Sequence, residues 1–508
     1  MLSLRKRYKG KNFKGRLRRS VVAAFIGALF IVFCLFYLGD SIQISSEPFA
    51  LSKDDMQNVF VHTTGARVVI FVMSDRIDHT LCYSVGSAYL SGLPVVVAGY
   101  QMEYKGFLSK FDFMERAIEN AQLNPDDVAI LMDSDTTFTG VDIHPFLDRF
   151  IAQSAATPEE LDALAVRQGR AMAPFIVSAE AGCWAGNVFE YHMGCKLGYE
   201  NNYAKVRKFN AEHLEHELVS SFDLSSHRYI NAGIAISRVW AYRELVQKAL
   251  NLVKTQPAKH KPENGWTCDQ SILAALYLDL LTWEAEQDVF SMPLLERQAA
   301  RSTYGVRAGF MSLDYANELS APRTMVLMHL TVMHDKDWAK YLPQYGIGHT
   351  HSQKINDFKA VIRFVSDLYK RAYAAHGKEI YTRLAVPRWV NGKRTSTKTF
   401  IKLTPPLLAT NPNHIDGSSN NARRTFPVIY HAAGDEVDYT KVEKMEYGAI
   451  GAQWLVPMVY NPQVEKETIK YLASMPLLLS THNSIIQDSY DAKCGFPFRG
   501  TIEEVLTA

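Results

Sequence analysis

The sequence has few cysteines, and they do not form the patterns that usually give cysteines a role. There are 6 in 508 residues, with no CxxC pair and no zinc-type spacing. This excludes a small disulfide-stapled fold and gives no support to a structural zinc site. No Asn-x-Ser/Thr sequon occurs either, so N-glycosylation says nothing about the compartment. The chain also lacks an internal repeat, which excludes a repeat architecture.

Composition does not set the chain apart from globular proteins. Hydrophobic residues make up 47% and charged residues 21%, so most of the chain should fold around real cores. The net charge is only +2, although it is unevenly distributed. A chain of 508 residues is too long for one ordinary domain, and we expect two.

The N-terminal residues lack acids and are followed by a run without any charge. Residues 1–19 carry nine Lys or Arg, and residues 21–39 read VVAAFIGALFIVFCLFYLG. At about 1.5 Å per residue, this run spans most of a roughly 30 Å hydrocarbon layer. A cleaved signal peptide is the alternative, but its apolar part is usually about 7–15 residues and precedes small residues. Here the run ends in Phe36, Tyr37 and Leu38, which favours an uncleaved anchor.

The positive tail also sets the expected orientation of the anchor. Lys and Arg stay on the cytosolic side, so the remainder should lie in a lumen or outside the cell, as in a type II protein of the Golgi or ER. A basic tail can instead bind nucleic acid, but beside a membrane span it more simply sets orientation, and we expect no nucleic-acid partner. An odd number of cysteines then faces an oxidising compartment, so at least one is free or pairs outside the chain. These cysteines are Cys82, Cys183, Cys195, Cys268 and Cys494.

Apolar runs alternate with helical spacing in the segment that follows. Strands are expected at 67–75, 94–100 and 128–135, with helices at 84–92 and 105–122. Further along, we expect a strand that runs into a loop at 176–186, and a turn, a strand and a helix at 228–250. A helix at 266–280, a strand at 324–338 and a long helix at 351–377 follow. Continuous apolar strands alternating with helices are typical of a parallel α/β sheet covered on both faces.

The chain is therefore expected to have five parts. They are a basic cytosolic tail (1–19), a transmembrane anchor (20–39), a stem (40–65), an α/β domain (66–344) and a smaller C-terminal α+β region of unknown role (345–508).

Two carboxylates end one of the expected strands, in the stretch VAILMDSDTTFTG at 128–140. Asp-Ser-Asp is good turn chemistry, and a solvated turn is the plain interpretation of the triplet alone. However, ligands collect at the carboxyl ends of strands in open α/β sheets, where Asp75 also falls. Carboxylates at i and i+2 can both reach one Mn²⁺ or Mg²⁺ ion, which removes the repulsion between them. Asp133 and Asp135 are thus candidate metal ligands in a sugar-transfer enzyme, where an ion stabilises the departing nucleoside diphosphate.

Other residues can be tested against this idea. A third ligand should come from a distant strand end, and His329 in VLMHLTVMH fits, with His334 as a second choice; a lone histidine is also often structural. Asn231 in YINAG offers an amide to sugar or acceptor, or belongs to a strand-entry turn. Asp269 at a helix start is either a first-turn acid or a carboxylate at the reacting sugar. Trp184 offers a face for a sugar ring, or is an ordinary core aromatic.

These segments, in this order, resemble a known family. The series is a strand ending in DSD, then SAEAGCW, YINAG, CDQ at a helix start, and an apolar strand with a histidine. It is similar to the glycosyltransferase domain of the procollagen lysyl hydroxylase/glucosyltransferases and procollagen galactosyltransferases. It resembles still more closely the expression-site-associated glycosyltransferase-like membrane proteins of trypanosomes. The resemblance covers about residues 66–340.

The resemblance implies a GT-A-like fold, a UDP-sugar donor and Mn²⁺. It carries the metal role onto Asp133, Asp135 and His329, and catalytic or sugar-contacting roles onto Trp184, Asn231 and Asp269. Donor contacts are implied for two segments and for the serine between the acids, namely Val72, Ser74, Asp75, Tyr100, Lys105 and Ser134. The iron/2-oxoglutarate hydroxylase domain of the collagen enzymes is not evident in the sequence, so a collagen substrate is not implied.

The leading hypothesis is a type II membrane glycosyltransferase that moves a hexose from a UDP-sugar to a glycan, glycoprotein or glycolipid. Two alternatives remain open at this point. One is a catalytically inactive, transferase-like binding protein of the lumen or surface. The other is a metal-dependent phosphodiesterase or phosphatase, which normally needs more His and Asp ligands.

Overall fold

The chain forms two units, Met1–Phe49 and Ala50–Ala508, and the fold described here belongs to the second. The computed structural model describes residues 66–322, 427–431 and 470–495, apart from gaps at 90, 92, 139–142, 214–221, 223–226 and 316. It also places the backbone of short strands at 49–50, 330–332, 385–390, 393–401, 407–416 and 419–425. Within these residues no helix has the length and apolar character needed to span a bilayer. The anchor expected at 20–39 lies outside them.

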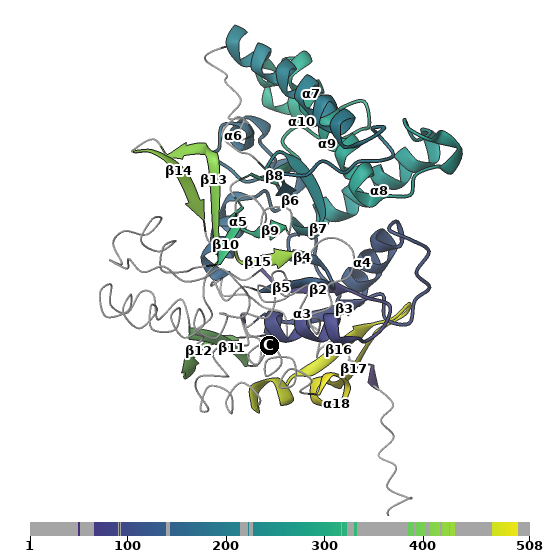
Figure 1. The fold of residues 1–508 in the computed structure, drawn as a ribbon, viewed down its shortest axis with the longest axis vertical. Helices are drawn as coiled ribbons and strands as arrows, with labels where there is room; N and C mark the ends of the chain where they lie inside the picture. The colour runs from purple at the N-terminus through teal and green to yellow at the C-terminus, as the bar shows by residue number, and fades with distance from the viewer. Residues whose placement is uncertain are drawn as a thin grey trace, which may run out of the picture. The chain divides into compact units, whose positions relative to one another are not determined.

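A mixed, mostly parallel sheet forms the centre of the second unit (Figure 1), in the order β17-β16-β3-β2-β4-β7-β6-β8. Its strands are β2 (Val68–Met73), β3 (Val95–Ala98), β4 (Val128–Asp133), β6 (Phe175–Glu180), β7 (Tyr229–Arg238), β8 (Met311–Asp314), β16 (Pro476–Ser480) and β17 (Ile485–Ser489). The neighbours β16, β3, β2 and β4 run parallel, whereas β7 and β17 are antiparallel to the strands beside them. The α/β class expected from the sequence is confirmed.

The apolar strands are buried because both faces of the sheet are covered. Along β2, Val69 and Phe71 belong to one hydrophobic cluster, whereas Ile70 and Val72 belong to a second. Since successive side chains of a strand point to opposite faces, this alternation requires cover on both sides. The helices among the described residues are α3 (His79–Tyr89), α4 (Ser109–Asn120), α5 (His144–Gln153), α6 (Ala163–Arg167), α7 (His192–Glu212), α8 (Val239–Thr255), α9 (Asp269–Glu286), α10 (Leu294–Ala299) and α18 (Tyr490–Cys494).

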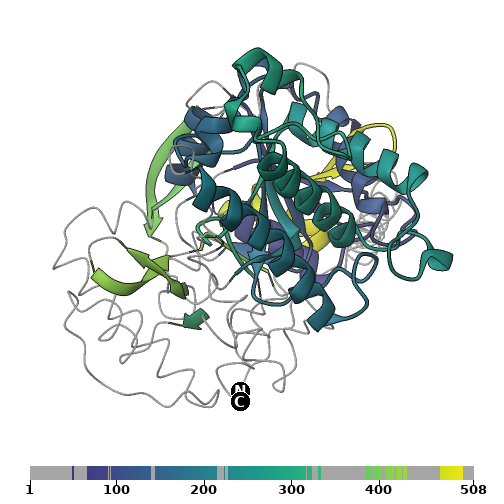
Figure 2. The same cartoon turned by 90° about the horizontal axis from the view of Figure 1, so that it is seen from above.

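Two strands from the C-terminal part of the chain, β16 and β17, extend the sheet beyond β3. β16 pairs in parallel with β3, beside which it is labelled in Figure 1, and the yellow C-terminal segments lie among the purple and blue segments of the early chain in Figure 2. A disulfide between Cys82 and Cys494 joins α3 to α18. The sequence leaves the role of residues 345–508 open, and the described segment 470–495 packs into the same core as the early strands. Of the cysteines expected on the oxidising side, Cys183 and Cys195 also pair, and Cys268 is free.

Three smaller sheets contain strands from the described segments after residue 300. β15 (Ile429–His431) lies between β5 (Thr136–Phe138) and β9 (Ser320–Pro322). In the second sheet, β10 (Leu330–Val332) pairs with β13 (Leu407–Asp416), and β13 with β14 (Ser419–Thr425). In the third, β11 (Ala385–Val390) pairs with β12 (Lys393–Ile401). Of the strand expected at 324–338, the described residues include β10; the remainder of that range and the helix expected at 351–377 lie outside them.

Candidate metal centre

Two strands bring the acid pair and a distant histidine together. Asp133 is the last residue of β4, and Asp135 lies in the turn between β4 and β5. β15 runs antiparallel to β5 so that His431 stands opposite Thr136, directly after Asp135. Ligand atoms of the three side chains all lie within 4.8 Å of one another. The sequence predicts a third ligand from a remote strand end, and the structure places His431 there; His329 lies outside the described residues.

His431 is held in one orientation by Asn231. The ring is 4% exposed, and its Nδ1 lies 2.7 Å from Oδ1 of Asn231, which also accepts a hydrogen bond from the backbone N–H of Gly233. Because that oxygen is an acceptor, Nδ1 carries the proton, and Nε2 faces the acids. Nε2 lies 3.2 Å from Oδ1 of Asp135 and 4.0 Å from Oδ2 of Asp133. A neutral Nε2 in this orientation is a suitable metal ligand.

A bulge in β7 makes room for this histidine. The pairing of β6 with β7 shifts register between Val177 and Ser178, opposite the stretch from Asn231 to Ala235. Such bulges redirect side chains beside functional sites. A Cβ added to Gly233 would lie only 2.0 Å from the His431 ring, so glycine is required for the ring to approach. The motif YINAG therefore serves to hold a histidine two hundred residues away, which explains both its asparagine and its glycine.

Lys110 occupies the other side of Asp133. Its Nζ lies 2.7 Å from Oδ2 of Asp133 and 3.2 Å from Oδ2 of Asp269, and the side chain is only 12% exposed. Lys110 comes from the first turn of α4, and Asp269 is the first residue of α9. Burial alone would lower the pKa of Lys110, but the two carboxylates outweigh it, so the pKa is raised and the amine stays charged.

The two acids have opposite electrostatic environments. Burial raises the pKa of Asp133, and Lys110 offsets this only in part. Burial also acts on Asp135, but His431 outweighs it and the pKa of Asp135 is lowered. For His431, burial lowers the pKa and the two acids reverse the effect, so the pKa is raised. Each carboxylate thus has its own cationic partner.

A cavity of about 420 Å³ opens beside the acid pair. Among the predicted donor contacts, Ser74, Asp75 and Ser134 line it together with both acids and Lys110. Two exposed rings also lie on its wall, Tyr104 at 46% and Phe107 at 52%. Neither aromatic residue was predicted as a site residue. The sequence places Phe107 in the predicted helix 105–122, whereas α4 begins at Ser109 and Phe107 lies just before it.

The remaining predicted contacts lie away from this cavity in the described part of the chain. Val72 is fully buried in β2. Tyr100 donates its backbone N–H to Ser480, and Lys105 pairs with Glu103 on the surface. Trp184 is 59% exposed, and its ring packs against His192 with the centroids 5.1 Å apart. The structure thus joins Asp269 and Asn231 to the acid pair, through Lys110 and His431, but not Trp184.

The residues fit a divalent cation. Two carboxylates and one imidazole form the only such group found among the described residues, and this mixed oxygen and nitrogen set suits Mn²⁺ better than Ca²⁺. In comparisons with known proteins, no family matches the chain and no curated protein is similar to it. The case for a function therefore depends on the geometry.

Proposed function

We propose that this chain is a metal-dependent glycosyltransferase that moves a hexose from a UDP-sugar to a glycan, glycoprotein or glycolipid. The observation that carries the proposal is the cluster of Asp133, Asp135 and His431, whose two acids line a cavity large enough for a nucleotide. The mostly parallel sheet, with the acids at the carboxyl end of β4, is consistent with the GT-A-like fold that the sequence resemblance implies.

The side chains around the cavity have suitable chemistry for a UDP-sugar. A divalent cation held by Asp133, Asp135 and His431 would neutralise the negative charge of the departing diphosphate. Lys110 adds a fixed positive charge beside Asp133, where a phosphate oxygen would lie within reach. Tyr104 and Phe107 offer exposed faces on which a uracil ring can stack, and Asp75 is an acceptor for ribose hydroxyls.

The location proposed for this activity is the lumen of the Golgi or ER, with the chain anchored by residues 20–39. Two disulfides, Cys82–Cys494 and Cys183–Cys195, support an oxidising compartment, because disulfides are rare in the cytosol. The proposal includes a membrane anchor and no nucleic-acid partner.

The test is binding and turnover by the full-length chain. Mn²⁺ with UDP should raise the melting temperature more than either alone, and a panel of UDP-hexoses should include one that is hydrolysed or transferred. Replacing Asp133 and Asp135 by asparagine should remove both effects while the disulfides still form. No stabilisation by Mn²⁺ and UDP, together with no turnover of any UDP-hexose, would contradict the proposal.

One observation favours a second candidate function, a transferase-like binding protein without catalysis. Lys110 neutralises Asp133 and Asp269 within the protein, so the acid cluster is stable without an ion. That protein would fold normally and bind Mn²⁺ and UDP weakly or not at all. The melting experiment separates the two candidates, since only the transferase should gain stability from the ion and nucleotide together.

A further inference from the structure

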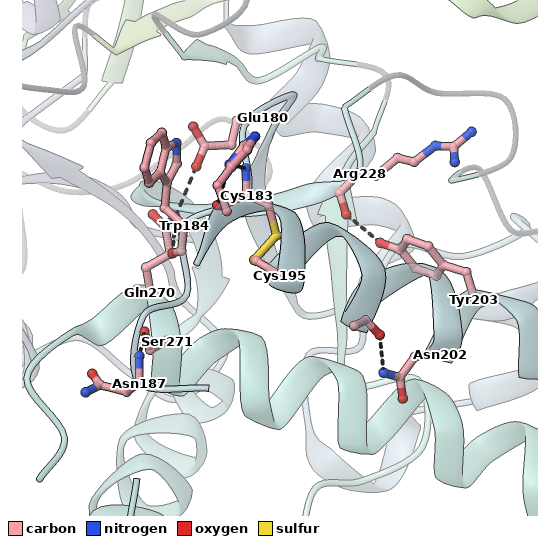
Figure 3. The surroundings of a disulfide bond; sticks show 12 residues. Glu180, Cys183, Trp184, Asn187, Cys195, Asn202, Tyr203, Arg228, Gln270 and Ser271 are labelled. Carbon is pink, nitrogen blue, oxygen red and sulfur yellow. Dashed lines mark hydrogen bonds between the residues drawn. A yellow bond between two sulfur atoms is a disulfide. The ribbon is translucent and has the colours of Figure 1, made fainter. Parts of the chain in front are cut away.

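A disulfide-closed loop lies between the end of β6 and the start of α7 (Figure 3). The bridge joins Cys183 to Cys195, and both cysteines are 1% exposed. The backbone N–H of Cys183 donates to His192 within the same loop, which also carries the exposed Trp184. The loop is therefore closed covalently at its base and internally bonded, which fixes the residues between its ends.

One residue of this loop, Asn187, forms hydrogen bonds with the segment directly before α9. Its side-chain oxygen accepts from the backbone N–H groups of Thr267 at 3.0 Å and Cys268 at 3.1 Å, and its amide donates to the carbonyl of Gly265 at 3.1 Å. Its own backbone N–H donates to Ser271, and the residue is 6% exposed. Because Cys268 provides no side-chain cap for α9, these bonds are what fix the residues directly before Asp269.

Gln270 ties the same turn of α9 to the sheet and to the loop. Its amide nitrogen donates to Glu180 at the end of β6 and to the carbonyl of Trp184 in the loop, as Figure 3 shows. Its oxygen accepts from the backbone N–H of Ala232, beside the bulge that holds His431. Asp269 is thus fixed from both sides, by Asn187 before it and Gln270 after it.

We propose that the loop between Cys183 and Cys195 is a positioning element for the site, and that Asn187 is its key positioning residue. It sets the place of Asp269, which holds Lys110, which in turn contacts Asp133 at the candidate metal centre. The inference deepens the proposed function and rests on it, since Lys110 lines the cavity of the proposed site and Asp269 holds Lys110. Its immediate prediction concerns the position of Lys110 and needs no substrate.

The test is the rate at which acetylation reaches Lys110 in the full-length protein, followed by peptide mass spectrometry without metal or nucleotide. In the native protein Lys110 should react slowly, because it is buried between two carboxylates. In Asn187→Ala its rate should rise about tenfold, as local opening exposes the amine. Lys205, whose side chain is 49% exposed, serves as an internal reference and should not change.

Two further variants separate positioning from general loosening. Asn202→Ala removes a different amide, which donates to Gly198 within α7 and accepts from Thr282 of α9. Because Thr282 lies far along α9 from Asp269, this change should leave the labelling of Lys110 slow. Asn187→Asp keeps the accepting oxygen and should restore slow labelling. Should Asn187→Ala fail to fold, Gln270→Met takes its place with the same expected rise.

Different results would overturn the positioning role of Asn187 and the proposed transferase function. Unchanged Lys110 labelling in a folded Asn187→Ala or Gln270→Met protein would overturn the inference, as would equal increases in Asn187→Ala and Asn202→Ala. Absence of Mn²⁺ binding in the native protein would count against the transferase and leave the labelling result standing. If the protein does turn over a UDP-hexose, Asn187→Ala should lower kcat while Mn²⁺ affinity stays within about twofold, and Asn187→Asp should recover kcat.

Discussion

The two sides of the acid pair differ, although the acids stand two residues apart on one strand end. On one side Asp133 meets Lys110, which is buried, permanently charged and held by Asp269. On the other side Asp135 meets His431, whose charge can be removed by losing a proton. The comparison teaches that the pair is stable without metal, and that an ion would displace the proton of the histidine rather than the lysine.

The strongest way to break this comparison is to remove both acids. In the variant with Asp133→Asn and Asp135→Asn, the charged ligands of the ion are lost and Mn²⁺ binding should fall below detection. Lys110 and His431 lose their partners at the same time. Titration of Mn²⁺ by electron paramagnetic resonance measures the effect, and Asp75→Asn, which changes another acid of the cavity wall, serves as a control that keeps binding. Tight Mn²⁺ binding by the double variant would refute the assigned ligands.

Removing only the histidine should have the next largest effect. His431→Ala deletes a ligand and should weaken Mn²⁺ binding by about 100-fold. In the native protein, affinity should also rise with pH until it passes the raised pKa of His431, because the ion and the proton compete for Nε2. This pH dependence should disappear in His431→Ala. An identical pH profile in both proteins would show that another group binds the ion.

The protonation of His431 predicts that stability changes with pH in opposite directions with and without Mn²⁺. The folded-state pKa of His431 is raised above its ordinary value of 6.5, so its contribution to stability is complete below 6.5 and is lost as pH rises through the folded value. The metal-free protein should therefore become less stable over this window, whereas Mn²⁺ should stabilise it more. Melting curves at several pH values, with and without Mn²⁺, measure both slopes; parallel slopes would argue against the histidine as ligand.

A smaller effect is expected from the glycine beside the ring. Gly233→Ala places a methyl group against His431 and should reduce Mn²⁺ affinity about tenfold, with a loss of about 1–3 kcal/mol in the free energy of unfolding. Gly186→Ala is the matched control, since a Cβ there meets nothing within 4 Å. Chemical denaturation and Mn²⁺ titration of the two variants test the prediction. Equal behaviour would show that His431 moves freely.

Lys110→Met should leave Mn²⁺ binding intact, in contrast to His431→Ala, and so distinguishes the two sides of the acid pair. The change leaves Asp133 and Asp269 buried without their cation, so the metal-free protein should lose about 3–5 kcal/mol of stability. Mn²⁺ should bind at least as tightly, because a neighbouring positive charge is gone. The difference in melting temperature caused by Mn²⁺ should then be larger than in the native protein. A smaller difference would mean that Lys110 supports the ion.

The sequence was sufficient to predict the sheet and the acid pair because both depend on local patterns. Continuous apolar runs at 67–75 and 128–135 require burial on both faces, and β2 and β4 fulfil this. Asp133 and Asp135 follow from their place at a strand end. Cys82, Cys183, Cys195 and Cys494 pair through the tertiary fold, and so their pairing could not be predicted from spacing.

Lys110 and His431 could not be predicted as site residues, for a different reason. VLMH at 326–329 and VIYH at 428–431 are both short apolar runs that end in histidine, and nothing local says which one pairs with β5. Lys110 lies within the predicted helix 105–122, but helical spacing does not show that its amine points toward an acid pair on another strand. Long-range strand pairing and the placement of α4 decide these contacts.

The most direct test of the account is the anomalous scattering of manganese in crystals of the protein grown with Mn²⁺ and UDP. The account predicts a single peak bounded by Asp133, Asp135 and His431, with the diphosphate of UDP beside it and Lys110 still against Asp133. No peak at these residues would contradict the metal centre, and two peaks about 3.5–4 Å apart would indicate phosphodiester chemistry instead.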